Sequence, residues 1–376
     1  MACATRSIPG CGAEPLVTSG RPELSDALLQ VKGLHTQFPT SRGLVRAVDG
    51  VDLEVRSGEV LGVVGESGCG KTMTALSILR LLPDPGRITA GQILFRGRDV
   101  TAMSPEQVRD FRGNEVAMIF QDPMTSLNPV TKVGSQIEEA MTAHSKFSQQ
   151  IAKERVLELL TRVRVPSAER RAQDYPHQFS GGMRQRAMIA MGLSNEPALL
   201  IADEPTTALD VTVQAQIIDL LKRLNTEMGA AIMLITHNMA LVASLCDRVV
   251  VMYAGRVVEE GPVEQIFSSP QHPYTWSLLR SVPRVDQARR ERLVSIEGLP
   301  PDLSRLPGGC KFHPRCPFVE ARCREEEPPL AEVASAQKAR CWVLMRTLGD
   351  NPQDRIEPSA ARATLLSAGE ADGAVG

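Results

Sequence analysis

A glycine-rich segment in the first quarter of the chain carries the clearest chemical signal. It has the form Gly-x-x-x-x-Gly-Lys-Thr, it follows a short apolar run at 60–64, and it opens a predicted helix. In that context the glycines let backbone N–H groups curve around phosphate oxygens, and the helix N-terminus adds partial positive charge. The alternative, a glycine-rich turn with a chance lysine, is disfavoured by the flanking strand and helix. The segment predicts a nucleotide phosphate site formed by Gly65, Glu66, Ser67, Gly68, Cys69, Gly70, Lys71 and Thr72.

An acidic pair, Asp203 and Glu204, ends a second apolar run that begins at Leu199. The pair is therefore expected at the carboxyl edge of a sheet, where ligands bind in open α/β folds. Asp203 suits the shell of a Mg²⁺ ion, together with the hydroxyl of Thr72. Glu204 suits a general base that polarises an attacking water. Alone, such a pair is usually solvated surface, but a phosphate loop in the same chain favours the catalytic interpretation.

A third segment, Phe179-Ser180-Gly181-Gly182-Met183, precedes a predicted helix and lies shortly before the acidic pair. A serine at a helix start caps free N–H groups, and two glycines form a flexible nest for an anion. Taken alone, the pattern indicates only a helix start. Its position between the phosphate loop and the acidic pair favours a role in nucleotide binding.

The elements that must position these residues alternate along the chain. Four short apolar runs predict buried strands at 60–64, 198–202, 231–236 and 248–253. Helical patterns follow at 71–82 and 211–224, and residues 105–175 are expected to be mainly helical. Strands that alternate with helices predict a mostly parallel α/β sheet.

The composition excludes several classes of protein. The chain has 376 residues, with 42 Lys and Arg against 44 Asp and Glu. A net charge of -2 gives no general attraction to DNA or RNA, so no nucleic-acid partner is expected. No segment approaches the roughly 18 consecutive apolar residues of a membrane span. The N-terminal segment lacks the apolar core of a secretory signal, which predicts a cytosolic chain.

The order of motifs resembles that of the ATP-binding subunits of ABC transporters. Gln121 matches the family's glutamine-bearing loop, Asp210 its aspartate-bearing loop and His237 its switch histidine. Phe38 is the candidate for the aromatic residue that stacks on adenine, with a core-facing Phe as the alternative. The resemblance implies a P-loop NTPase fold of the α/β class. It consists of a RecA-like core with an antiparallel β subdomain, an inserted helical subdomain and a small loop-rich C-terminal extension.

The resemblance also implies a mechanism. ATP lies on the phosphate loop, with Mg²⁺ held by Thr72, Gln121 and Asp203. Glu204 orients the attacking water, and His237 stabilises the charge that develops on the γ-phosphate. The signature segment, Ser180, Gly181, Gly182 and Met183, closes over ATP bound to a second, related ATPase subunit. Hydrolysis then releases the two subunits from each other. This cycle of closure and release is a ligand-dependent two-state switch.

Residues 121–129 and 180–186, with the sequence His272-Pro273-Tyr274-Thr275, resemble the oligopeptide and dipeptide importer branch. That resemblance implies an ATPase that energises peptide import at the cytoplasmic face of the inner membrane. Its partners are two transmembrane permeases, a second ATPase subunit and, indirectly, an extracytoplasmic peptide-binding protein. The same machinery with another cargo, such as a nickel chelate or glutathione, is one alternative. A non-transport ABC ATPase is the other.

The domain organisation expected from the sequence has four parts. They are a leader at 1–27, the ATP-binding domain at 28–265, the C-terminal extension at 266–346 and a tail at 347–376. The extension is rich in proline and carries Cys310, Cys316, Cys323 and Cys341. Their spacing is longer than the pairing usual in structural zinc sites. The sequence favours a [4Fe–4S] cluster that staples the extension, with zinc, and free or disulfide-bonded cysteines, as alternatives.

Overall fold

The computed structural model describes residues 27–281, apart from 42, 123–125, 145–146 and 208, and residues 296–348. The expected leader and tail therefore lie outside the described residues, except for a few positions at their inner ends. No helix of the described part is long and apolar enough to cross a membrane.

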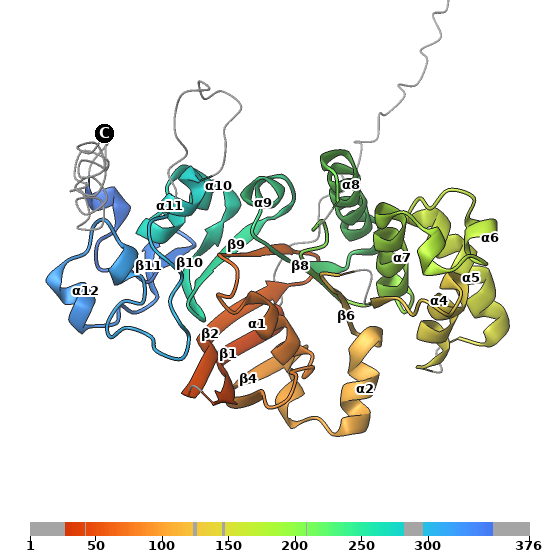
Figure 1. Ribbon diagram of the computed structural model, residues 1–376, viewed down its shortest axis with the longest axis horizontal. Helices are drawn as coiled ribbons and strands as arrows, with labels where there is room; N and C mark the ends of the chain where they lie inside the picture. Colours follow the sequence, from red (N-terminus) through yellow and green to blue (C-terminus); the bar gives the residue numbers. More distant parts are fainter. Residues whose placement is uncertain are drawn as a thin grey trace, which may run out of the picture.

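A central sheet of eight strands forms the middle of the molecule (Figure 1). Neighbouring strands follow the order β11 (Ala331–Ala334), β12 (Gln337–Ala339), β10 (Arg256–Pro262), β9 (Arg248–Tyr253), β3 (Val60–Val64), β8 (Ala231–Thr236), β7 (Leu199–Asp203) and β6 (Val116–Ile119). The strands from β9 to β6 are parallel. Every residue of β3, β7 and β8 is buried, as expected for short apolar strands that are covered on both faces.

Helices follow the parallel strands and place the loops at one edge of the sheet. Helix α1 (Lys71–Ile78) follows β3, α8 (Val211–Met228) follows the acidic pair, and α9 (Met239–Leu245) follows β8. The phosphate loop, the acidic pair and His237 therefore all lie at the carboxyl ends of neighbouring strands, which confirms the α/β prediction.

A second, antiparallel sheet packs beside α1 and shares its apolar core. It contains four strands: β1 (Ala27–Thr40), β2 (Gly43–Arg56), β4 (Arg87–Phe95) and β5 (Arg98–Asp99). This sheet is the antiparallel β subdomain that the resemblance implied.

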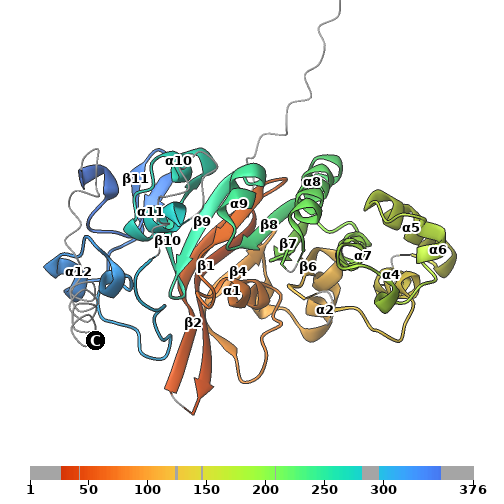
Figure 2. The same ribbon diagram turned by 45° about the horizontal axis from the view of Figure 1, so that its top comes forward.

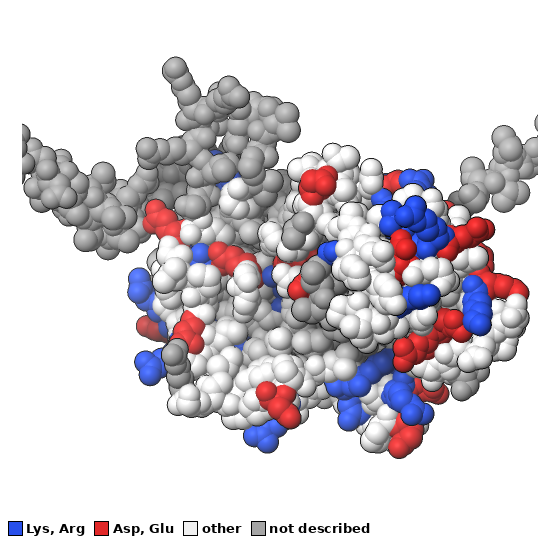
Figure 3. Space-filling model, turned by 45° about the vertical axis from the view of Figure 1, so that its right-hand side comes forward, with Lys and Arg blue, Asp and Glu red and all other residues white. Residues whose placement is uncertain are grey.

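A helical region, residues 133–193, is inserted between β6 and β7 and projects from one end of the molecule (Figures 1 and 2). It contains α4 (Val133–Thr142), α5 (Gln149–Arg162), α6 (Ala168–Arg171) and α7 (Gly181–Leu193). Before it come α2 (Pro105–Asn114) and β6, a strand that the expectation of a mainly helical 105–175 missed. Figure 3 shows that acidic and basic side chains are intermixed on this end, which gives no basic patch for nucleic acid on that face.

The C-terminal extension, residues 266–346, is joined to the central sheet. Strand β12 pairs with β10, and the extension also contains α11 (Pro273–Arg280) and α12 (Ala321–Glu325). At this seam the fully buried carboxylate of Glu259 accepts hydrogen bonds from the N–H groups of Gln271 and His272 and from Nε2 of Gln337. The extension therefore shares a sheet and buried polar contacts with the core, which the proline-rich sequence did not indicate. We call this junction, formed by β10, β12 and the hydrogen bonds to Glu259, the seam.

Candidate functional site: a nucleotide phosphate loop and its acidic edge

The phosphate loop connects β3 to α1 through glycines with positive φ. The φ angles are 152° at Gly65, 79° at Gly68 and 104° at Gly70. A Cβ on Gly65 would lie 2.2 Å from the carbonyl oxygen of Met252, and one on Gly70 would lie 2.3 Å from that of Ala47. No larger residue fits either position, so the backbone path of the loop depends on glycine.

Lys71 lies inside the loop that it is expected to serve. Its side chain is buried, and Nζ donates to the carbonyl oxygens of Gly65 at 2.8 Å and Glu66 at 3.0 Å. These carbonyls hold the ammonium group beside the loop's backbone. Next to it, burial raises the pKa of the Cys69 thiol, an effect that Lys71 opposes. Cys69 is therefore a packed thiol and not a reactive one.

Asp203 faces the phosphate loop with an unsatisfied oxygen. It is 2% exposed, the hydroxyl of Thr72 is hydrogen-bonded to its side chain, and its Oδ1 has no hydrogen-bond partner among the described residues. Burial raises the pKa of this carboxyl, the Thr72 hydrogen bond opposes that shift, and the Glu204 charge adds to it. A buried carboxylate oxygen beside a threonine hydroxyl is the donor set that Mg²⁺ prefers, so these residues fit the expected ion.

Glu204 and His237 come together at the ends of two adjacent strands. Nδ1 of His237 lies 2.9 Å from Oε1 of Glu204, and Oγ1 of Thr207 donates to Oε2 at 2.9 Å. Glu204 has a φ of 47°, an uncommon value for a residue with a side chain. Its side chain is 14% exposed, whereas that of His237 is 66% exposed. The pair therefore links a largely buried carboxylate to an imidazole that faces solvent.

The signature segment lies at the start of α7. Ser180 caps the helix by accepting from the N–H of Met183, and a Cβ on Gly182 would lie 2.7 Å from Val213 at the start of α8. Asp210 caps α8 in the same way. The contacts described for the segment are with α8 and its preceding loop, and none is with the phosphate loop of this chain.

Gln121 follows strand β6, whereas Phe38 belongs to strand β1. Gln121 is exposed and comes directly after Phe120 at the end of β6. Phe38 lies near the tip of the β1–β2 hairpin, where its ring packs on Gly86 so closely that a Cβ there would come within 2.2 Å. That contact is with the loop after α1, and a role of Phe38 toward adenine stays a prediction.

The four cysteines of the extension gather around one small apolar cluster. Cys323 is buried in it with Phe318, Val343 and Met345, and Cys310, Cys316 and Cys341 pack against it. Burial raises the pKa of the Cys316 thiol to about 12, and it also raises those of Cys310 and Cys341. All four are free thiols, so none forms a disulfide. Across the described residues no group of three or more His, Cys, Asp or Glu side chains is arranged to hold a metal ion. The expected [4Fe–4S] cluster, and zinc as its alternative, are therefore not supported by this arrangement.

Two contacts to the phosphate loop were missed by sequence reasoning. The hydroxyl of Tyr274 accepts a hydrogen bond from the N–H of Glu66, and Arg315 forms an ion pair with its carboxylate. Both partners lie in the C-terminal extension, some 200 residues or more along the chain. No local pattern connects residues at such a separation.

Comparisons with known proteins agree with this geometry. Residues 48–207 match the model of the ABC transporter family, and residues 258–323 match that of the oligopeptide/dipeptide transporter C-terminal region. The oligopeptide transport ATP-binding protein OppD of Bacillus subtilis is 48% identical over 84% of this chain and 89% of its own length.

The chain belongs to the ATP-binding subunits of ABC transporters.

Other relatives support the same family membership. The dipeptide transport ATP-binding protein DppD of Lactococcus lactis is 48% identical over 88% of this chain and 95% of its own length. Among solved structures, a dimeric, post-hydrolysis ATP-binding cassette bound to ADP and Pi is similar with a TM-score of 0.57 and 26% identity. It covers 62% of this chain and 98% of its own. The chain is thus an ABC ATPase with the cassette fold, and subunits of this family act with membrane permeases.

Proposed function

We propose that this ABC subunit binds and hydrolyses Mg²⁺-ATP on the phosphate loop to energise the import of dipeptides or oligopeptides. The observation that carries the proposal is the convergence of Lys71, Asp203, Glu204 and His237 at one edge of the sheet. The peptide cargo is supported by the names of the relatives and by the match to the peptide-transporter C-terminal region. A nickel chelate or glutathione is the alternative cargo.

The residues divide the reaction among them. Backbone N–H groups of the loop and Nζ of Lys71 bind the β- and γ-phosphates. Thr72, Asp203 and Gln121 would hold Mg²⁺, and the bound ion would neutralise charge at the phosphate oxygens. Glu204 orients water for attack on the γ-phosphate and accepts its proton. His237, hydrogen-bonded to Glu204, stabilises the charge that develops on the γ-phosphate.

The signature segment serves the ATP of a second ATPase subunit. Its glycines lie at the N-terminus of α7, with partial positive charge and free N–H groups, and the contacts described for it do not involve its own phosphate loop. A dimeric cassette among the similar solved structures supports such a pairing. We expect two ATP molecules at the interface and a related, non-identical partner.

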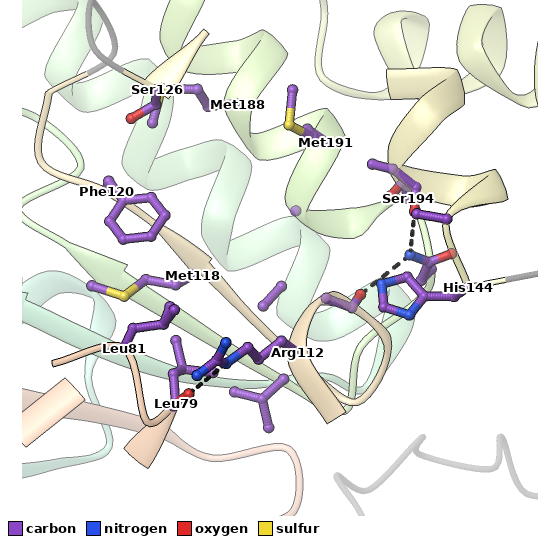
Figure 4. Close-up of a pocket in the computed structure, with 17 residues that line it drawn as sticks. Leu79, Leu81, Arg112, Met118, Phe120, Ser126, His144, Met188, Met191 and Ser194 are labelled. Carbon is purple, nitrogen blue, oxygen red and sulfur yellow. Dashed lines mark hydrogen bonds between the residues drawn. The ribbon is translucent and has the colours of Figure 1, made fainter. Parts of the chain in front are cut away.

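An apolar groove between the core and the helical region provides the seat for a permease. The cavity has a volume of about 290 Å³. In Figure 4, Leu81, Met118 and Phe120 from the core side and Met188 and Met191 from α7 line the same cavity. The side chain of Phe120 is 41% exposed, and Phe120 directly precedes Gln121, a candidate Mg²⁺ ligand. An element docked in the groove would therefore touch the residue next to the nucleotide site. We expect a short cytoplasmic helix of a transmembrane permease to occupy the groove, and we therefore propose that the subunit binds at the cytoplasmic face of the inner membrane.

Nucleotide binding and transport test the proposal in sequence. The purified chain should bind a fluorescent ATP analogue in the presence of Mg²⁺, and Lys71→Ala should lose this binding, because the ammonium group pairs with the phosphates. The chain reconstituted with its permeases and partner ATPase should then take up labelled dipeptides in an ATP-dependent manner. Absence of analogue binding by the unchanged chain would overturn the ATPase proposal. Uptake of a nickel chelate or glutathione in place of peptides would overturn only the cargo.

The iron–sulfur centre expected from the sequence is a separate proposal for the four cysteines. It rests on the cysteine spacing alone, because the thiols as placed pack around an apolar cluster and do not converge as ligands. The proposal predicts a brown protein with about four irons per chain after anaerobic purification. Colourless protein that carries zinc, or no metal, would overturn it and leave the ATPase proposal intact.

A further inference from the structure

All three polar groups of Glu66, the second residue of the phosphate loop, have partners. Its N–H donates to the hydroxyl of Tyr274 at 2.8 Å, and its carbonyl accepts from Nζ of Lys71 at 3.0 Å. Its carboxylate accepts from both terminal nitrogens of Arg315, at 2.7 and 3.0 Å. The same carbonyl also accepts from the N–H of Cys69 at 3.3 Å. Two of the four partners, Tyr274 and Arg315, belong to the C-terminal extension, so the extension holds this turn of the loop directly.

Arg315 is itself fixed in place. Its side chain is 6% exposed, and its Nε donates to the carbonyl of Glu297 at 2.9 Å. One terminal nitrogen also lies 3.4 Å from the hydroxyl of Tyr253 in β9. Burial lowers the pKa of the guanidinium, but the hydrogen bonds that it donates to Glu66 and Tyr253 reverse that effect and leave the pKa raised. A planar guanidinium that is held in this way can position a carboxylate in one orientation only.

Tyr274 is anchored equally firmly. It is fully buried in α11, and its ring packs against Tyr253 and Phe312 at centroid distances of 4.7 and 5.4 Å. Tyr253 belongs to the central sheet, whereas Phe312 lies in the same loop as Arg315. The three rings therefore couple the sheet, α11 and the Arg315 loop into one packed unit.

We propose that Arg315 and Tyr274 are positioning residues that hold the phosphate loop, through Glu66, in the shape that receives the triphosphate. The inference rests on the proposed function, because it requires ATP on that loop. A loop with three positive-φ glycines loses much conformational entropy when it is ordered, so holding it beforehand raises affinity. Lys71 must leave the carbonyls of Gly65 and Glu66 to reach phosphate oxygens, and the two contacts from the extension then keep the turn in place.

Nucleotide affinity and turnover of the full chain test the proposal. The variants are Glu66→Gln, Arg315→Gln, Tyr274→Phe and the double variant Glu66→Gln/Arg315→Gln. We expect each single change to raise the Kd of a fluorescent ATP analogue, and the KM for ATP, by about ten-fold, with kcat of the assembled transporter changed less than about two-fold. The Kd of the double variant should be no higher than that of the weaker-binding single variant, because both changes remove the same ion pair.

Matched variants separate positioning from mere stability. Arg322→Gln removes an exposed ion pair with Glu326 in the same extension and should leave the Kd unchanged. If Arg315→Gln does not fold, Arg315→Lys keeps the charge but not the two-pronged geometry, and its Kd should still rise several-fold. Folded variants with a lower Tm but an unchanged Kd would overturn the proposal. If the unchanged chain binds no analogue, the proposed function fails. Only this inference fails if the unchanged chain binds the analogue, if Lys71→Ala abolishes that binding, and if the Glu66 variants bind normally.

Discussion

The helical region and the C-terminal extension flank the same core but are attached to it differently. The helical region enters between β6 and β7, its described residues add no strand to the sheet, and it borders an apolar cavity of about 290 Å³. The extension adds β11 and β12 to the sheet edge and satisfies the buried carboxylate of Glu259. We therefore expect the helical region to move relative to the core during the ATP cycle and the extension to stay fixed, because packed, hydrogen-bonded seams open least readily.

The largest expected effect comes from Glu204→Gln, which tests whether motion belongs to the helical region alone. Loss of the base should reduce ATP turnover by about 10²- to 10⁴-fold but preserve ATP binding, which depends on the phosphate loop. The variant should accumulate an ATP-bound closed dimer. Hydrogen exchange with and without ATP should then show new protection over α7 but little change over β11 and β12. ATP turnover at the unchanged rate would show that Glu204 is not the general base. Equal changes in hydrogen exchange in the helical region and the extension would show that the extension does not stay fixed.

The second prediction concerns the seam of the extension. Glu259→Ala would leave three donors, the N–H groups of Gln271 and His272 and Nε2 of Gln337, without their buried acceptor. We expect the free energy of unfolding to fall by about 3 kcal/mol, as measured by urea denaturation. Glu332→Ala, at an exposed position of β11, is the control and should change it by less than about 0.5 kcal/mol. A similarly small change in the free energy of unfolding for both variants would show that the hydrogen bonds to Glu259 do not fix the extension to the core.

The third prediction is a pH dependence of the same seam. Burial, and the nearby Arg340 charge, lower the pKa of His272 to about 3, whereas an unfolded histidine titrates near about 6.5. Between these values the unfolded chain binds more protons, so stability is lost as the pH falls, by up to about 1.4 kcal/mol per pH unit. His272→Asn keeps an acceptor for the N–H of Tyr274 and should flatten the decrease in Tm between pH 6.5 and 4.5. An unchanged slope in this variant would show that another group controls the acid sensitivity.

The smallest effect is expected at the groove of the helical region. Met191→Glu places a charge in the apolar cavity, which should reduce peptide uptake by the reconstituted transporter several-fold. Nucleotide affinity of the isolated subunit should not change, because the phosphate loop is not involved. Val130→Glu, at a position that is 79% exposed and outside the groove, is the matched control. Uptake that is insensitive to Met191→Glu would place the permease contact elsewhere.

The chemistry at the nucleotide edge could be predicted from the sequence. The spacing from Gly65 to Thr72, and the pair Asp203-Glu204 after an apolar run, define groups that lie next to each other along the chain. The resemblance to ABC ATP-binding subunits then singled out His237, which follows the next apolar run, and parallel strands bring these carboxyl ends together. The parallel sheet followed from the same apolar runs, whereas the cassette fold was implied by the family resemblance. Strand β6 was missed because four residues within a helical stretch give too little periodicity.

Tertiary structure alone decided what surrounds that edge. The seam at Glu259, the groove beside Phe120 and the hold of Arg315 on Glu66 each join residues that are remote in sequence. The cysteine spacing predicted a metal centre, yet the described thiols pack into an apolar cluster without ligand geometry. Local propensity and spacing specify elements and motifs, whereas such long-range pairings depend on how buried polar groups find partners once the elements pack.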